Sequence, residues 1–254
     1  MTSDSSSSTV AGLSVTILGA SGSYAGPGGA CTGLLVRSPA ANVWLDAGPG
    51  TLANLQEHVG LRELSAIVLT HEHPDHWLEL PVVYAAVRHY EHRKPVPVYG
   101  TAGTLALAET MCPALPEAFD WRLIEDRDTA SIGDQEWHWS RTDHYVETMA
   151  SRVDVGESSF VFTADTGPKW DITQLGTGFD LLVSESTFLS SNEPEGILHL
   201  SARQAGSIAS EAGARRLILS HLAPGEEPAA HAAEAEAAYG APVDIAAIGQ
   251  VYSV

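Results

Sequence analysis

The densest group of chemically useful side chains is the segment His71–His76, which places three histidines and an aspartate within six residues. It follows the apolar run 66–69, which predicts a buried strand. Divalent metals such as zinc bind histidine nitrogens and carboxylate oxygens, about four per ion. Residues two apart on an extended chain point to the same side, and Pro74 imposes a turn after them. The segment therefore predicts two ligands for one metal ion, His71 and His73, and two for a neighbouring ion, Asp75 and His76.

Two other interpretations of this segment are weaker. Its first residues also begin the zinc-protease pattern H-E-x-x-H, but that pattern needs a second histidine where the chain has Asp75. It also needs a helix, which Pro74 would break. A polar loop with chance histidines would seldom hold ligand-type residues this densely. The metal site is the better interpretation.

Three more ligand-type residues follow predicted strands further along the chain. Strand ends can aim side chains at one point from a fixed backbone. Each match alone is weak evidence, but with the first four they make seven ligands. Seven ligands suffice for two metal ions with a bridging carboxylate and an open position for water. The three residues are His144 after strand 135–141, Asp165 after strand 158–163, and His221 after strand 216–219; no role is assigned to His58, His89, His92, His138 or His231.

The elements that position these residues alternate in a way that predicts two β-rich halves, each followed by helices. Such a pattern favours two packed sheets with helices outside. We expect residues 1–11 to be a disordered tail and residues 12–254 to be a single domain. The glycine-rich loop 19–29 lacks the Gly-Lys-Ser/Thr ending of a phosphate-binding loop and is expected to overhang the site as a flexible turn. Predicted helices cover 52–58, 78–90, 104–111, 201–211 and 229–239, and the other predicted strands cover 13–18, 33–37, 43–45, 95–99, 121–124, 151–155, 179–184 and 243–248.

Composition and charge exclude several classes of protein. The chain has 13 Lys+Arg against 32 Asp+Glu, a net charge of −19. This charge repels phosphate backbones, so we expect no stable nucleic-acid partner. A small anionic substrate is compatible with it, because two metal ions supply local positive charge. The two cysteines, Cys31 and Cys112, argue against a disulfide framework. The polar N-terminus does not resemble a signal peptide, and no run reaches the ~18 apolar residues of a membrane span. We therefore expect a cytoplasmic protein.

The order of the seven ligands resembles that of the metallo-β-lactamase superfamily. The motif H-x-H-x-D-H is highly specific, and the resemblance extends over nearly the whole chain, from Leu13 to Tyr252. It implies an α/β (α+β) protein with the four-layer αββα metallo-β-lactamase sandwich and two metal ions at one edge. It further implies a hydrolase and a homodimer. The implied ligands are His71, His73 and His144 for one ion and Asp75, His76 and His221 for the other, with Asp165 bridging them.

Two further residues resemble the ribonuclease Z-like phosphodiesterase branch of that superfamily. Glu185 lies in a carboxylate-bearing segment, and His199 begins the sequence His-Leu-Ser-Ala ahead of the final ligand. Gly22-Ser23, the turn 46–50 and the segment 164–167 resemble the actinobacterial cyclic-nucleotide-degrading phosphodiesterases. The resemblance implies that Asp46 and Glu185 are not ligands but support the site, Asp46 by hydrogen bonds to a ligand or to the turn backbone.

The chain also departs from the ribonuclease Z pattern. The enzymes that process tRNA 3′ ends carry a long arm between the positions of His144 and Asp165, and here only 20 residues separate them. Their Pro-x-Lys loop is missing, and the net charge is unfavourable for tRNA. Val161 stands where the acidic partner of His199 is expected, which leaves that partner open. We therefore disfavour tRNA processing.

The predicted activity is metal-dependent hydrolysis of a small phosphodiester, such as a cyclic nucleotide. Two ions about 3.5–4 Å apart lower the pKa of a shared water, so that metal-bound hydroxide can attack phosphorus. Zinc is the first expectation, and manganese and iron suit the same ligands. Asp75 or Asp165 would accept the proton, and His199 would protonate the leaving alkoxide. In the alternative, His199 only precedes the helix N-cap Ser201.

Other classes stay open at this stage. A carbon-ester hydrolase, of the lactonase or thioesterase type, would use the same seven ligands without an acid such as His199. An iron persulfide dioxygenase would keep fewer of the metal positions, and structural zinc sites are closed and dominated by cysteine. Near His144, the aromatic residues Trp137, Trp139 and Tyr145 could line a base-binding wall. We expect them to be hairpin core instead, because aromatic residues dominate cores.

Overall fold

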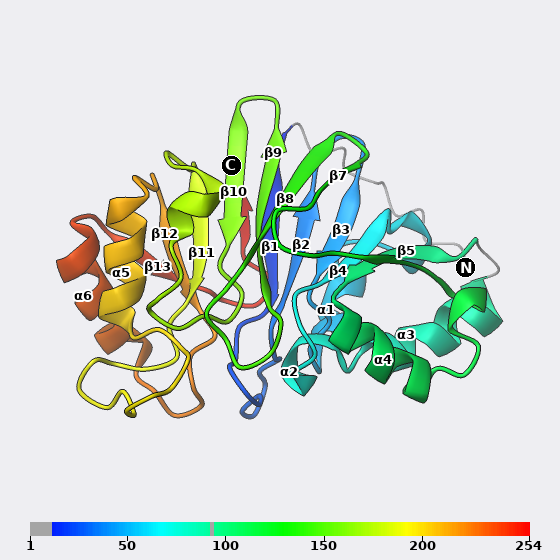
Figure 1. Ribbon diagram of the computed structural model, residues 1–254, viewed down its shortest axis with the longest axis horizontal. Coiled ribbons are helices and arrows are strands. Elements are labelled where there is room, and N and C mark those ends of the chain that lie inside the picture. Colours follow the sequence, from blue (N-terminus) through cyan, green and yellow to red (C-terminus); the bar gives the residue numbers. More distant parts are fainter. Residues whose placement is uncertain (1–11, 92–93) are drawn as a thin grey trace.

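Two mixed sheets of seven strands each face one another, with the helices outside them (Figure 1). The computed structural model describes residues 12–91 and 94–254. The first sheet has the order β14 (Val251–Ser253), β1 (Ser14–Gly19), β2 (Gly33–Arg37), β3 (Asn42–Leu45), β4 (Ala66–Leu69), β5 (Val96–Gly100) and β6 (Phe119–Leu123). The second has the order β13 (Val243–Ile245), β12 (Leu217–Ser220), β11 (Leu181–Glu185), β10 (Ser158–Phe162), β9 (Met149–Val155), β8 (Gln135–Arg141) and β7 (Thr129–Ile132).

Helices cover the outer face of each sheet, which gives four layers (Figure 1). In β4, Val68 packs between the two sheets, while Ile67 and Leu69 pack beneath the helices. Successive strand residues point to opposite faces, so a strand buried on both faces reads as a continuous apolar run. The predicted αββα sandwich is confirmed. The first sheet is covered by α1 (Thr51–Gln56), α2 (Pro74–Trp77), α3 (Leu80–Ala86) and α4 (Ala102–Met111), and the second by α5 (Ala202–Glu211) and α6 (Pro228–Tyr239).

Parallel pairing brings the carboxyl ends of several strands together. β3 is parallel to β4 in the first sheet, and β10, β11 and β12 are parallel to one another in the second. β8 runs in the same direction as β10, because two antiparallel pairings through β9 separate them. The segments that follow these strands carry all the predicted ligands, with Asp75 and His76 in the short helix α2 and the others in loops or directly at the strand ends.

The structure corrects some of the predicted elements. The predicted helix over 78–90 is confirmed only in part: α3 begins at Leu80, with Pro81 in its first turn, and at Ala86 it passes into a π-helical turn, η2 (Val87–Glu91). Proline is tolerated in a first turn, where its missing N–H has no partner to lose. The last predicted strand is shorter than expected, and β7 and β14 were not predicted. The tail 1–11 and His92 lie outside the described residues.

Cys31 and Cys112 are both buried free thiols. Within residues 12–91 and 94–254, no helix is long and apolar enough to cross a bilayer.

Phe160 of β10 offers a test of the core between the sheets. Its side chain is fully buried there. We expect Phe160→Ala to lower the free energy of unfolding by about 3–5 kcal/mol, because it removes buried contacts and leaves a cavity. Leu123→Ala, at a residue that is 53% exposed, should change it by no more than about 0.5 kcal/mol. Denaturant unfolding measures both, and equal losses in the two variants would contradict this packing.

Candidate metal centre

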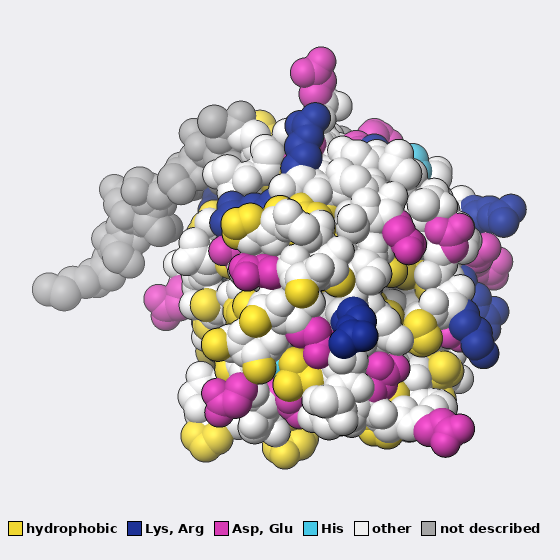
Figure 2. All heavy atoms as spheres, turned by 90° about the vertical axis from the view of Figure 1, so that its left-hand side faces the viewer, with side chains coloured by type: hydrophobic (Ala, Val, Ile, Leu, Met, Phe, Trp, Pro, Cys, Tyr) yellow, Lys and Arg dark blue, Asp and Glu magenta, His cyan; other side chains and the backbone are white. Residues whose placement is uncertain are grey.

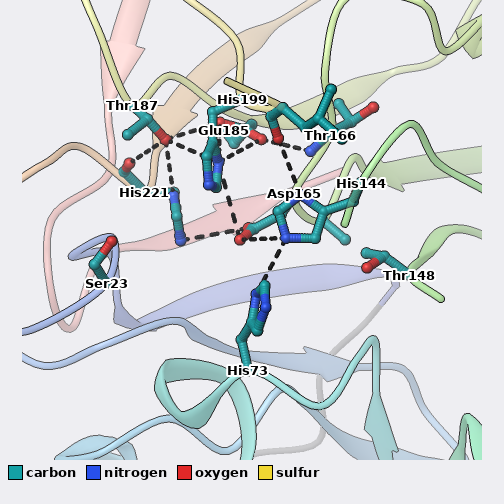
Figure 3. A network of polar contacts seen from close by, with 12 residues as sticks. Ser23, His73, His144, Thr148, Asp165, Thr166, Glu185, Thr187, His199 and His221 are labelled. Atoms are coloured by element: carbon teal, nitrogen blue, oxygen red, sulfur yellow. Dashed lines mark hydrogen bonds and ion pairs between the residues drawn. The ribbon is translucent and has the colours of Figure 1, made fainter. Parts of the chain in front are cut away.

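The first of two groups of ligand-type side chains brings together residues from three loops. His71 Nε2 and His144 Nε2 each lie 3.1 Å from His73 Nδ1. Oδ2 of Asp165 lies 3.7 Å from His71 Nε2 and 3.8 Å from His144 Nε2. In Figure 3, His73, His144 and Asp165 point toward one another. These four side chains, His71, His73, His144 and Asp165, are called the first ligand set.

The second ligand set consists of Asp75, His76 and His221, together with the same aspartate, Asp165. The two imidazoles approach to 3.4 Å between their Nε2 atoms. Asp75 Oδ2 lies 3.6 Å from His76 Nε2 and 3.3 Å from His221 Nε2. Asp165 Oδ1 lies 3.3 Å from both of those nitrogens. Asp165 therefore directs one carboxylate oxygen toward each set, as a bridging ligand would.

The chemistry of these donors fits two divalent cations. Asp165 is 2% exposed, and among the described residues none is hydrogen-bonded to its Oδ1. A buried carboxylate oxygen without a hydrogen bond is costly unless a cation compensates its charge. The ring nitrogens of each set lie within 4.8 Å of one another. All seven residues predicted as ligands are thus brought together, in the two groups that the resemblance implied.

The electrostatics of the first set favour metal-binding protonation states. Burial lowers the pKa of His71, His73 and His144, in the case of His71 well below its usual value, although the charge of Asp165 opposes this. Burial alone would raise the pKa of Asp165, but the surrounding histidines hold it well below its usual range. Neutral imidazole and ionised carboxylate are the forms that bind a metal.

In the second set, a proton competes with the metal. Burial disfavours protonation of His76, but the charges of Asp165 and Asp46 raise its pKa well above the usual value. A divalent cation held by His76 Nε2 and Asp165 would replace that proton. Metal binding to this set should therefore release a proton.

Asp46 contacts the second ligand set through His76. It is fully buried in the turn after β3. Its carboxylate lies 2.7 Å from His76 Nδ1 and accepts hydrogen bonds from the backbone N–H and the hydroxyl of Thr70. Because Nδ1 is occupied, Nε2 of His76 faces the set. Asp46 thus contacts both His76 and the neighbouring backbone.

Glu185, at the end of β11, occupies the position of the missing acidic partner of His199. Both of its carboxylate oxygens lie 3.1 Å from His199 Nδ1. The carboxylate is 1% exposed and also accepts hydrogen bonds from the N–H groups of Thr166 and Leu200. Burial disfavours protonation of His199, but Glu185 raises its pKa to about 9. Val161, on the neighbouring strand, is instead buried in the core on the helix-covered face of the second sheet.

This contact also bears on the alternative role of His199. Ser201 is the N-cap of α5, and its N–H donates to the side chain of Gln204. His199 lies outside that helix, and its ring packs 5.0 Å from the ring of His144 and 5.4 Å from that of His221. A helix-capping role leaves these contacts unexplained.

Thr187 is a site residue that the sequence analysis missed. Its hydroxyl donates to Glu185 Oε2 at 2.8 Å and lies 3.0 Å from His221 Nδ1 (Figure 3). It therefore links the environment of His199 to a ligand of the second set. Its position two residues after Glu185, at the same strand end, was the available signal.

The glycine-rich loop lies directly against the second set. The N–H of Ser23 donates to Asp75 Oδ2 at 2.8 Å. A Cβ atom on Gly22 would lie 2.7 Å from both Nδ1 and the carbonyl oxygen of His221. The loop therefore contacts residues of the second ligand set directly.

The three aromatic residues near His144 separate into two groups. Trp137 and Trp139 are buried between the sheets, as expected for core. Tyr145 is 57% exposed, so for this residue the expectation is wrong. The tryptophans lie two apart on β8 and share a face, whereas Tyr145 lies in the loop beyond the strand.

Gly22→Ala tests the second set. We expect its affinity for zinc to fall by about 10-fold or more, because the new methyl group would displace His221. A zinc titration against a competing chelator measures this. Gly26→Ala in the same loop is the control, because its Cβ would meet nothing within 4 Å. Equal zinc affinities in the two variants would contradict the assignment of His221.

Comparison with known proteins agrees with this geometry. The model of the family "Beta-lactamase superfamily domain" matches residues 41–222. An uncharacterised protein of Mycobacterium leprae (strain TN) is 30% identical, over 97% of this chain and 90% of its own. A ribonuclease Z of Mycobacterium bovis (strain BCG / Pasteur 1173P2) is 28% identical, over 85% of this chain and 88% of its own. The crystal structure of the metallo-β-lactamase fold protein YhfI from Bacillus subtilis has a TM-score of 0.88 and 25% identity, covering 95% of this chain and 99% of that one. With its ligand order, its fold and these matches, the chain belongs to the metallo-β-lactamase superfamily of hydrolases.

Proposed function

We propose that this protein is a dinuclear-metal phosphodiesterase that acts on a small phosphodiester such as a cyclic nucleotide. The observation that carries the proposal is the contact between buried Glu185 and partly buried His199 beside the two ligand sets. Hydrolysis of a phosphodiester breaks the bond to a poor alkoxide leaving group, and a proton donor at that oxygen accelerates the step, whereas a thioester releases a thiolate that needs no such acid. The similarity to a protein named ribonuclease Z supports phosphodiester chemistry.

The two ligand sets suit zinc first, because histidine and carboxylate are common zinc ligands, while manganese and iron accept the same donors. When bound, two such ions supply a water of lowered pKa and positive charge for the phosphate oxygens. Asp165 and Asp75 offer carboxylate oxygens between the histidines, where the proton of the attacking water can be accepted.

His199 acts on the leaving side of the reaction. Glu185 occupies its Nδ1, so Nε2 is the ring nitrogen left for the substrate. The ring lies over both ligand sets, 5.0 Å from His144 and 5.4 Å from His221. In a 3′,5′-cyclic nucleotide, the P–O3′ bond breaks, the proton passes to O3′, and the product is a 5′-monophosphate.

Two features favour a small substrate over tRNA. The segment between His144 and Asp165 consists of a short loop and the β9–β10 hairpin, so no stretch of chain is left over for a long arm. On the face shown in Figure 2, lysine and arginine side chains are scattered among acidic ones. The net charge of −19 also repels a phosphate backbone.

Hydrolysis of 3′,5′-cyclic AMP by zinc-loaded protein tests the substrate class. We expect turnover by the wild type and none by Asp165→Ala, because the variant loses the carboxylate shared by both ligand sets. Lactones and thioesters are assayed in parallel. Turnover of those esters by protein that binds two zinc ions, without phosphodiester hydrolysis, would replace the proposal with a carbon-ester hydrolase.

His199→Ala tests the proposed acid. We expect turnover to fall by about 10²–10⁴-fold while the zinc content stays unchanged, because the residue donates a proton and does not hold metal. Glu185→Gln should lower turnover by a smaller factor, since it keeps a hydrogen-bond acceptor but removes the charge. His138→Ala, at a half-exposed histidine outside both sets, is the control. Loss of zinc from His199→Ala would make this residue a ligand instead.

A further inference from the structure

Tyr145 combines solvent exposure with a fixed orientation at the metal centre. It follows His144 in the loop between β8 and β9, and 57% of it is exposed. Its ring packs edge-on against the ring of His144, at 5.2 Å between centroids and 66° between planes. Its hydroxyl accepts a hydrogen bond from the N–H of Leu198 at 3.0 Å. The ring is therefore held at its edge and at its tip while remaining open to solvent.

The same contacts place this ring on the side of the proposed acid. The carbonyl of Leu198 lies 2.9 Å from His144 Nδ1, and its N–H donates to the hydroxyl of Tyr145. Two consecutive residues of the β8–β9 loop therefore each contact one backbone group of Leu198. The next residue is His199, whose ring lies 5.0 Å from that of His144. If His199 protonates the leaving oxygen, the leaving alcohol lies beside Tyr145.

We propose that the ring of Tyr145 is the stacking surface for the aromatic part of the leaving alcohol, so that the site selects phosphodiesters of nucleosides. This inference rests on the proposed function. Bases stack on aromatic side chains with little regard to sequence, because every base has a π-face. A ring already held in place loses little conformational entropy when the base binds. The buried Trp137 and Trp139 offer no such surface.

The test compares Tyr145→Phe with Tyr145→Leu in the zinc-loaded protein. Phenylalanine keeps the ring and loses the contact with Leu198, whereas leucine loses both. For cyclic AMP, we expect Tyr145→Leu to raise KM by about 10-fold with a smaller change in kcat, and Tyr145→Phe to stay within about 2-fold of wild type. Ribose 3′,5′-cyclic phosphate, which lacks the base, should show no difference between the variants. Binding of AMP, measured by calorimetry, should weaken in Tyr145→Leu by the same factor as KM rises.

Two control variants complete the comparison. Tyr90→Leu, at a 73% exposed tyrosine on η2, should behave as wild type. Tyr24→Leu examines the 63% exposed tyrosine of the glycine-rich loop, and a rise in KM there without one in Tyr145→Leu would overturn the proposal. An equal loss of kcat in Tyr145→Phe and Tyr145→Leu would also overturn it, and would make the hydroxyl a positioning contact for His199.

Failure of the inference can be separated from failure of the proposed function. A wild type that hydrolyses neither cyclic AMP nor bis(4-nitrophenyl) phosphate would overturn both. Hydrolysis by the wild type with unchanged KM and AMP affinity in Tyr145→Leu would overturn the stacking proposal alone.

Discussion

The burial of the Asp165 carboxylate is the constraint on which the rest of the site depends. Its two oxygens face different groups of histidines, and water does not reach them to compensate the charge. The surrounding imidazoles must therefore be aimed with little freedom, which loops alone would not achieve. The two sheets supply that rigidity, because the ligands are carried by segments that follow their strands, and three of these strands, β4, β10 and β12, are buried on both faces.

Three residues of the site have left-handed backbone conformations. Asp46, Ala164 and His221 have positive φ angles of 58°, 51° and 57°, each directly after a strand or just before a ligand. Left-handed conformations cost L-residues roughly 1–2 kcal/mol each, and such strain concentrates at functional sites. The parallel strands behind these turns offset that cost, so the ligand sets keep their shape.

Much of the site could be predicted because its ligands are local in sequence or directly follow apolar strands. The segment His71–His76 needs no tertiary information, and the continuous apolar runs follow from burial on both faces. The pairing of Glu185 with His199 could not be predicted in the same way. It depends on the path of the chain after β11, which brings His199 back to Glu185 across 14 residues. Likewise β14 is three residues long with one buried side chain, too little for a periodic pattern to be recognised.

The pairing of β14 affects how the protein folds during its synthesis. β14 pairs with β1, although more than 230 residues separate Ser14 from Ser253. During synthesis, the first sheet cannot complete this edge until the strands of the second sheet have already been translated. Contacts of such long range slow folding and leave β1 with an unpaired side in the nascent chain. The two sheets should therefore acquire their native order together, and chaperones would find β1 accessible until the last strand is added.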